Sequence, residues 1–524
     1  MAGFSRRSDL VQEDRRPGAH ACRPDPGRAM RPIHVAIVGC GRIADMHAPG
    51  YAGRDDARIF AVCDTDPTLA AKRKQEWNAE RVYTDYAALL ADPDIDAVEI
   101  LTPQKLHEPM VIAAARAKKH VALQKPMTID LKKARRMIEA MKASGCVFRL
   151  TDNYIYYPPL VRLREIIDAG EIGTPTNLRI KFISGGLGGW QVPASSWKWR
   201  MQEREEGRGM QTFDHGHHLW AAATFLLGSI DRVHAWIDSI DGVIDSPAVV
   251  TWKYRDAMRY GMCEYVHAAE LSIPSDYYAN DEWFEVSGSR GVAIVRRCTG
   301  RLDTGPIISL FNEKGWQHFS DIASDWLEGF RGATQNFIES IQGKTKPDLD
   351  GTSGYEILRL SLAIQRSAIE HREVFVEELD STWPLLTRMR LRRADKKLQS
   401  KEGLLARLFG STQRYASQAE SLTLNLLDRY DESQAKGWSS TIGISLLADG
   451  SAPAMAFGLY IADGKPRLEV GLPEDPVLLI TIPAGTWAAI LLGKKRIETA
   501  FLQGRLKVEG RLEEALPLRA AFRI

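Results

Sequence analysis

The stretch from His34 to Ala44 constrains the fold of this chain more than any other. It opens with a β-rich apolar run that ends at Val38, long enough for one buried strand and too short for a helix. Gly39 and Gly41 follow, and Ala44 takes the third small position of a G-x-G-x-x-G/A pattern. In this pattern the first glycine permits a tight turn, the second lets the backbone approach a pyrophosphate, and the third lets a helix pack closely on the strand. The pattern therefore predicts a strand, a phosphate-binding turn and a helix whose N-terminus faces an anion.

A second apolar strand strengthens the case for a dinucleotide. Residues 59–63 form this strand, and Asp64 follows it. A carboxylate roughly 20 residues after the glycines is where the ribose 2′-OH finds its acceptor. A glycine turn between a strand and a helix also occurs in proteins that bind no nucleotide. The prediction of dinucleotide binding therefore depends on the second strand and on Asp64 at its end. We predict a Rossmann unit that binds NAD(H), with NADP(H) as the alternative because Arg42 and Lys72 could tolerate a 2′-phosphate.

The composition is that of an ordinary multidomain globular protein. The chain has 524 residues, too many for one core, with 44% hydrophobic and 26% charged side chains. Its formal net charge of +2 creates no field that would favour nucleic acid, and no apolar run approaches the roughly 18 residues of a membrane span. The six cysteines are widely spread without a C-x-x-C pair, which argues against a disulfide scaffold or a zinc ribbon. We expect a cytoplasmic protein with no nucleic-acid partner and no membrane span.

Residues 31–150 alternate between apolar strands and helical segments. Further strands are expected at 97–101, 120–123 and 147–150. Strands spaced by helices indicate βαβ units and a parallel sheet, which binds ligands at the carboxyl ends of its strands. The candidate residues at such ends are Gly39, Asp64, Thr102 and Lys125.

The pattern changes from about residue 151. Short alternating segments between 177 and 295 predict an open, largely antiparallel sheet, and helices are expected at 330–341 and 354–369. The predicted fold class is α/β, with a Rossmann domain at 31–150 and an α+β open-sheet substrate and oligomerisation domain at 151–378.

Lys125 is the first candidate catalytic residue. It stands in Gln124-Lys125-Pro126, where Pro126 cannot continue the strand and the chain turns out at the mouth of the sheet. A lysine beside a nicotinamide can polarise a substrate oxygen. A surface lysine before a proline is the commoner arrangement, so Lys125 is singled out because its strand end joins three others.

Asp214 and His218 form the second candidate set. Their spacing of four residues puts both side chains on one face of a helix, where His218 could take a proton from an alcohol and Asp214 could orient the imidazole. The intervening His215 and His217 would point elsewhere and are interpreted as structural. Because no matching Glu or Cys cluster is apparent, we expect no metal ligands here.

These motifs, in this order, resemble the glucose–fructose oxidoreductase / inositol dehydrogenase (Gfo/Idh/MocA) family over about residues 31–378. The resemblance implies an N-terminal Rossmann domain and a C-terminal α/β domain whose open sheet covers the nicotinamide. It also implies NAD(P)-dependent oxidation or reduction of a small molecule, usually a sugar, a cyclitol or a derivative. The catalytic set that it carries over is Lys125, Asp214 and His218. The cofactor contacts that it carries over are Gly39, Gly41, Arg42, Ile43, Asp64, Thr102, Pro103, His107 and Gln124.

Two positions depart from the family pattern. The usual Glu-Lys-Pro is Gln-Lys-Pro here, so Gln124 lacks the charge that normally neighbours the lysine and the nicotinamide ribose. The acidic residue often found three positions after the motif's histidine is Ala221. Both departures put the usual sugar substrate in doubt and leave the acid–base pair intact.

The ends of the chain differ from its centre. Residues 1–30 are predicted to be a disordered tail or sequence before a start at Met30, and 379–404 to be a basic linker. Residues 405–524 predict a small α/β domain. Its strand at 478–482 and the segment 498–510 resemble the sterol-carrier-protein (SCP-2) family, which implies an apolar tunnel. The alternative for this domain is packing or dimerisation without a ligand.

Two functional hypotheses follow. The first is an NAD(P)-dependent dehydrogenase, expected to be a homo-oligomer, that acts on the CH–OH or ketone carbon of a sugar-like, cyclitol or lipid-linked substrate. The alternative is a non-catalytic protein whose Rossmann unit senses dinucleotide while the C-terminal domain binds a lipid or sterol-like ligand.

Overall fold

The computed structural model describes residues 31–190, 209–239, 244–255, 258–380, 412–435, 437–450, 452–502, 505–511 and 514–523. The predicted N-terminal tail and all but the first two residues of the predicted basic linker at 379–404 lie outside these ranges, so both stay predictions. The chain divides into two compact units, the first comprising residues 1–162 and 322–359 and the second 163–321 and 360–524. Within the described ranges, no helix is both long and apolar enough to cross a bilayer.

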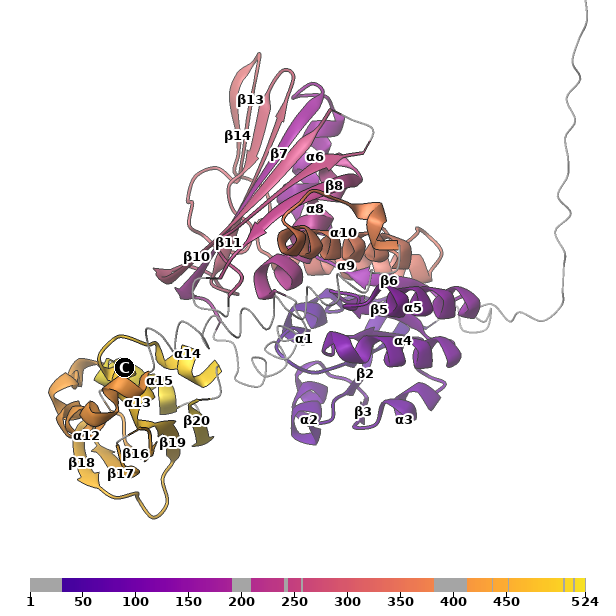
Figure 1. Cartoon of the computed structure of the whole chain (residues 1–524). Coiled ribbons are helices and arrows are strands. Elements are labelled where there is room, and N and C mark those ends of the chain that lie inside the picture. The colour runs from indigo at the N-terminus through magenta and orange to yellow at the C-terminus, as the bar shows by residue number, and fades with distance from the viewer. Residues whose placement is uncertain are drawn as a thin grey trace, which may run out of the picture. The chain divides into compact units, whose positions relative to one another are not determined.

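A six-stranded parallel sheet forms the centre of the first unit, as the sequence predicts (Figure 1). Its strand order is β3-β2-β1-β4-β5-β6. The strands are β1 (Ile33–Val38), β2 (Ala57–Cys63), β3 (Arg81–Tyr83), β4 (Ala97–Ile100), β5 (His120–Gln124) and β6 (Phe148–Thr151). The order reverses between β1 and β4, and ligands of doubly wound folds bind outside the carboxyl ends of the strands at that point.

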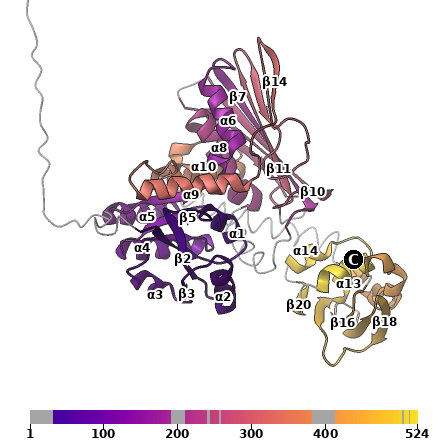
Figure 2. The same ribbon diagram turned by 180° about the vertical axis from the view of Figure 1, so that it is seen from behind.

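Helices connect these strands, and side-chain caps fix where three of them begin. The Asp66 carboxylate accepts from backbone amides at the start of α2 (Pro67–Glu76), and Asp130 does the same for α5 (Leu131–Ser144). Gly145, at φ +73°, ends α5 in the left-handed region. The remaining helices of the alternating region are α1 (Ala44–His47), α3 (Tyr86–Ala91) and α4 (His107–Arg116). Helices α4 and α5 pack side by side (Figure 2).

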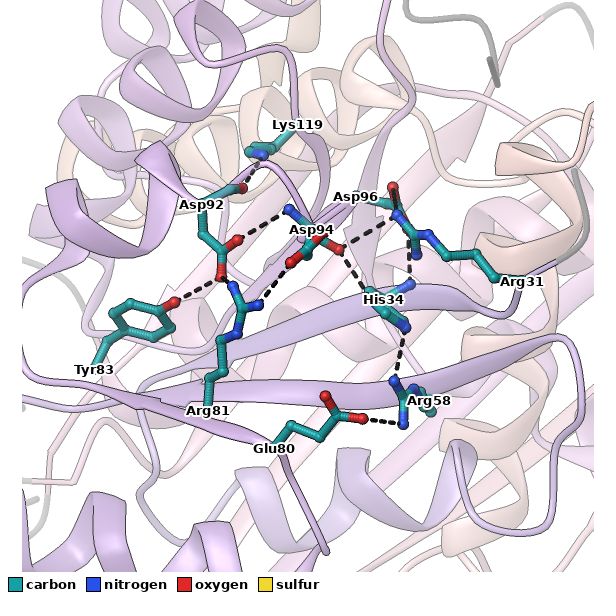
Figure 3. A network of polar contacts seen from close by, with 10 residues as sticks. All are labelled: Arg31, His34, Arg58, Glu80, Arg81, Tyr83, Asp92, Asp94, Asp96 and Lys119. Atoms are coloured by element: carbon teal, nitrogen blue, oxygen red, sulfur yellow. Dashed lines mark hydrogen bonds and ion pairs between the residues drawn. The ribbon is translucent and has the colours of Figure 1, made fainter. Parts of the chain in front are cut away.

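A network of charged and polar groups joins the amino ends of the strands, at the edge opposite the candidate ligand edge (Figure 3). Asp96 accepts from the Arg31 guanidinium at 2.7 and 2.9 Å and from the backbone N–H of His34 at 2.9 Å. The Lys119 ammonium donates to the carbonyls of Asp92 and Ile95, both at 2.7 Å. These contacts fix the loop before β4 against the starts of β1 and β5.

The second unit contains a nine-stranded sheet in the order β14-β13-β12-β11-β7-β10-β9-β8-β15 (Figure 2). Only the β7–β10 pair is parallel among the strand pairs described, so the expectation of an open, largely antiparallel sheet is confirmed. The strands are β7 (Pro175–Leu187), β8 (Ile230–Ile237), β9 (Ala248–Tyr254), β10 (Tyr260–Ser272), β11 (Asn280–Gly288), β12 (Val292–Val295), β13 (Ile308–Asn312), β14 (Gly315–Phe319) and β15 (Val374–Phe375). Sequence reasoning missed β10, where polar residues break the apolar alternation after Tyr265, and it also missed β13, β14 and β15, which lie beyond residue 295.

Helices accompany both larger sheets. The helix α8 (Gly216–Leu227) packs against β7 in the second unit. The helix α9 (Leu327–Ile341) belongs to the first unit, where it packs against α1 and η2 (Ala48–Gly50). The long helix α10 (Gly351–Glu370) follows it. Both α9 and α10 were predicted to within a few residues.

The C-terminal region has its own five-stranded sheet, ordered β18-β17-β16-β19-β20. Its strands are β16 (Ser440–Leu447), β17 (Met455–Ala462), β18 (Lys465–Val470), β19 (Leu478–Pro483) and β20 (Lys507–Gly510). The strand expected at 478–482 is confirmed as β19, and β20 lies within the segment 498–510. The helix α13 (Ala484–Leu491) is buried along its whole length against this sheet.

Acid should destabilise the first unit through His120. The backbone N–H of Val147 donates to His120 Nδ1 at 3.0 Å, and burial lowers the pKa of His120 to about 4. An unfolded histidine titrates near pH 6.5, so the unfolded state alone binds this proton between pH 6.5 and 4, and the free energy of unfolding falls by about 3 kcal/mol as the pH drops through that window. In His120→Asn the side-chain oxygen can still accept from Val147, and the pH dependence measured by urea denaturation should become shallower by about one proton. An unchanged slope would contradict this assignment.

Candidate active site

The turn after β1 has the geometry of a phosphate-binding loop. Gly39 has φ +93°, and a Cβ there would lie 3.0 Å from the carbonyl carbon and oxygen of Leu101, just after β4. Gly41 has open space where its Cβ would be, with no atom within 4 Å. Ile43 is the N-cap residue of α1, and Arg42 beside it is exposed. The first glycine is therefore required by the fold, whereas the second leaves room for a ligand.

Asp64 holds this loop as well as standing at the predicted ribose position. One carboxylate oxygen accepts from the backbone N–H of Cys40 at 2.7 Å, and the other accepts from Asp66 N–H at 3.0 Å. Arg73 adds a bond from Nε to the Cys40 carbonyl at 3.2 Å. Each carboxylate oxygen keeps a second lone pair, so Asp64 can still accept from a ribose hydroxyl.

His107 ties together the loops that follow β4 and β5. Its ring is buried, with Nε2 2.8 Å from the Thr102 carbonyl and Nδ1 3.1 Å from the Met127 carbonyl. Burial lowers the pKa of His107, although the two carbonyl contacts act against that effect. The Thr102-Pro103 turn leads into the short helix η3 (Gln104–Leu106). His107 thus positions the backbone on which Thr102 lies.

The Gln124-Lys125-Pro126 turn follows β5 at the same edge of the sheet. Lys125 is partly exposed, and its backbone N–H donates to Gln124 Oε1 at 2.7 Å. The amide nitrogen of Gln124 lies 3.1 Å from Nε2 of the buried His47. The structure therefore gives Gln124, the departure from the family pattern, a defined partner in the core.

Asp214 and His218 lie on a helix in the second unit, but the helix begins differently from the expected α-helix. Residues Met210–His215 form a π-helical segment (η5) that continues into α8. The half-buried Asp245 carboxylate accepts from the backbone amides of Gln211 and Thr212 at 2.8 and 2.7 Å and so fixes the start of the π-helical segment. Short π-helical segments often occur at functional sites.

His215 has a partner that sequence reasoning missed. Its Nε2 lies 2.9 Å from Oε1 of Glu282, a fully buried acid on β11, and its ring lies 5.5 Å from the ring of His218. Glu282 also accepts from Asn280 Nδ2 at 2.7 Å and from Thr299 Oγ1 at 2.9 Å. The signal available in the sequence was that Glu282 alternates with Phe284 and Val286 and so shares their buried face of the strand.

Gly39, Asp64, Thr102 and Lys125 therefore share one edge of the first unit, as predicted. Asp214 and His218 belong to the second unit, so the complete catalytic set stays a prediction. In the described ranges, no group of three or more His, Cys, Asp or Glu side chains is arranged to hold a metal ion.

Comparison with known families gives three matches. The model described as the oxidoreductase family with an NAD-binding Rossmann fold matches residues 33–151, and the GFO/IDH/MocA C-terminal domain matches residues 160–294. The SCP-2 sterol transfer family matches residues 423–523. Both resemblances seen in the sequence are confirmed.

Curated relatives extend over the first two-thirds of the chain. The uncharacterized oxidoreductase YrbE of Bacillus subtilis is 32% identical over 363 residues, which are 65% of this chain and 98% of the relative. The chain belongs to the GFO/IDH/MocA oxidoreductase family. The myo-inositol 2-dehydrogenase of Thermotoga maritima is 24% identical over 66% of this chain and 99% of its own length. A levoglucosan dehydrogenase solved with NADH and levoglucosan has the same fold, with a TM-score of 0.55 and 22% identity over 66% of this chain and 100% of that one.

Membership of the GFO/IDH/MocA family establishes the class of reaction. The chain is an oxidoreductase with an NAD-binding Rossmann domain, as the first hypothesis expects, and its curated relatives include proteins named D-apiose dehydrogenase and D-glucoside 3-dehydrogenase. Gln124 and Ala221 remain its departures from the family pattern.

The two loop glycines should respond differently to the same added methyl group. Gly41→Ala meets no neighbouring atom, so we expect an unchanged Tm and at least tenfold weaker NADH binding, because the methyl group fills the space that a pyrophosphate needs. Gly39→Ala adds strain at positive φ and a close contact with Leu101, so it should lower the Tm as well. NADH fluorescence titration and calorimetric melting measure the two effects. Unchanged NADH affinity in Gly41→Ala would argue against a pyrophosphate at this turn.

Proposed function

We propose that this protein moves a hydride between NAD(H) and a secondary alcohol or ketone carbon of a cyclitol or sugar derivative that carries an apolar group. One observation supports the dehydrogenase activity. The glycine turn, Asp64 and Lys125 follow β1, β2 and β5 and therefore lie at the same edge of the parallel sheet. The C-terminal SCP-2 match supports the apolar part of the substrate.

In the proposed reaction the protein's own residues bind the substrate and move the proton. Lys125 donates a hydrogen bond to the reacting oxygen, His218 accepts the hydroxyl proton during oxidation, and Asp214 orients the imidazole. A bound nicotinamide would supply the hydride acceptor for the carbon that carries this hydroxyl. Asp64 favours NAD(H) over NADP(H), because a 2′-phosphate would meet a carboxylate that already anchors the loop through Cys40 and Asp66.

His215 and Glu282 are proposed to shape the substrate end of this site. Glu282 is anchored by Asn280 and Thr299 as well as by His215, so the imidazole beside His218 is held in one orientation. A fixed imidazole suits recognition of a substrate hydroxyl, because a site built to hydrogen-bond a hydroxyl rejects analogues that lack it.

For the C-terminal domain we propose an apolar ligand. Leu478, Ile480 and Ile482 point to the buried face of β19, and Trp487 on α13 packs in the same cluster. Trp487 Nε1 donates to Thr423 Oγ1 at 2.8 Å, which fixes the indole ring inside this layer. A wide apolar layer between a sheet and its helices is the kind of interior that an acyl chain or sterol could share. The competing role is dimerisation.

The proposed chemistry predicts that Lys125→Met and His218→Asn each lower kcat by roughly 10²–10⁴ while NADH affinity stays within about twofold. The assay follows NADH formation with a panel of cyclitols, sugars and their alkyl glycosides. Lys132→Met, on the exposed side of α5, is the charge-matched control and should behave as wild type. Full activity in Lys125→Met would remove this lysine from the mechanism.

The C-terminal proposal predicts fatty-acid binding by the full chain and none by a chain that ends at residue 380. Each buried CH₂ adds about 0.8 kcal/mol, so affinity should climb with acyl length until the interior is full. Titration with fluorescent fatty acids of increasing length measures this. The dimerisation alternative predicts no uptake at any length, together with a smaller oligomer on sizing of the truncated chain.

A further inference from the structure

A chain of four buried or partly buried side chains in the first unit ends at the peptide group of Lys125. Tyr51 donates from its hydroxyl to Glu99 Oε2 at 2.8 Å, and His47 Nδ1 lies 2.8 Å from Glu99 Oε1. His47 Nε2 lies 3.1 Å from the amide nitrogen of Gln124, whose oxygen accepts from the Lys125 N–H at 2.7 Å. These residues come from η2 and its neighbours, from β4 and from the end of β5.

The direction of every hydrogen bond in this chain follows from one fixed donor. The backbone N–H of Lys125 can only donate, so the oxygen of Gln124 faces it and the NH₂ group faces His47. His47 Nε2 must then accept, which puts the ring proton on Nδ1 and directs it to Glu99. The two partners thus fix the orientation of the ring and the tautomer of its neutral form.

The surroundings of His47 supply the charge balance of this buried site. Phe330, on α9, packs edge-to-face against the His47 ring, and the two ring centres lie 5.0 Å apart. Burial raises the pKa of Glu99, but His47, the Arg149 charge and the Tyr51 hydroxyl outweigh it and hold the pKa below its ordinary value. The Arg149 guanidinium on β6 is buried and lies 5.7 Å from the centre of the Phe337 ring. The Arg149 charge therefore helps to keep Glu99 ionised in this buried site.

We propose that His47 is a positioning residue: anchored by Glu99, it holds the Gln124 amide and thereby fixes the peptide N–H and the orientation of Lys125. The catalytic consequence rests on the proposed role of Lys125, whereas the positioning itself does not. Gln124 has the neutral side chain that such a relay needs, because it donates to the histidine and accepts from the lysine peptide at the same time.

Two substitutions of His47 each remove one of its two hydrogen bonds, either the bond to Gln124 or the bond to Glu99. In His47→Asn the amide nitrogen replaces Nδ1 and keeps the bond to Glu99, but nothing reaches Gln124. In His47→Gln the side-chain amide reaches the place of Nε2 and keeps the Gln124 contact, while Glu99 loses its imidazole partner. A buried carboxylate that loses a partner destabilises the fold more than a partly buried amide that loses one. A purely structural role therefore predicts the greater damage in His47→Gln, and a positioning role predicts greater functional damage in His47→Asn.

The test uses the full chain with NADH bound and measures hydrogen–deuterium exchange at the Lys125 amide. Pro126 has no N–H, so peptides ending at 124 and at 126 isolate that one amide. We expect exchange at Lys125 to rise at least fivefold in His47→Asn and clearly less in His47→Gln, while the Tm falls more in His47→Gln. Tyr51→Phe, which removes a bond to Glu99 at the far end, is the control and should lower the Tm without changing this exchange.

Kinetics give the second readout. With a substrate that wild type turns over, kcat should fall about tenfold in His47→Asn, with a smaller loss in His47→Gln and little change in KM for NAD. Exchange at Lys125 that is unchanged in His47→Asn, or that follows the order of the Tm losses, overturns the positioning role. If wild type turns over no member of the panel, the proposed function fails, and the exchange measurement still decides the role of His47.

Discussion

The first unit depends on the close approach of two neighbouring strand ends at the point where the sheet order reverses. Gly39 brings the turn after β1 so near to Leu101 that a side-chain carbon would touch the Leu101 carbonyl. This approach is possible only with a residue that tolerates φ +93° and has no Cβ. The same turn leaves Gly41 open, and Asp64 bonds to it from the neighbouring strand. A single steric constraint thus produces both the fold of the crevice and its room for a dinucleotide.

The two edges of the parallel sheet use their polar groups in different ways. At the amino edge, acids and bases such as Arg31 and Asp96 pair with one another and with the loop backbone, leaving little capacity for a ligand. At the carboxyl edge, Asp64 keeps spare lone pairs and Lys125 stays partly exposed. The two edges differ because the strands are parallel, so that all carboxyl ends lie at one edge of the sheet and all amino ends at the other.

A buried acid links the core of the sheet to the carboxyl edge. An isolated carboxylate in the place of Glu99 would cost several kcal/mol in lost hydration. Tyr51, His47 and the Arg149 charge offset that cost. Such a site tolerates little displacement, because moving any one partner leaves the carboxylate uncompensated. The turn that carries Lys125 is joined to this rigid site through Gln124, so the flexible lysine side chain starts from a well-fixed backbone.

The sequence by itself determined the elements whose signals are local. The strand, glycine turn and helix at 33–47, the alternating helices and strands up to β6, and the C-terminal strand β19 could be predicted because steric demands and apolar periodicity act within about a dozen residues. The positions of Asp64 and Lys125 at strand ends followed from the same patterns.

Only the tertiary structure decided which distant residues meet. His47 and Gln124 are 77 positions apart, Gln211 and Asp245 are 34 apart, and His215 and Glu282 are 67 apart. Hydrogen-bond pairing between such residues depends on strand order and register, which periodicity does not encode. For that reason the sequence presented Gln124 as a missing charge, whereas the fold shows it as a neutral link between a buried histidine and the candidate catalytic lysine.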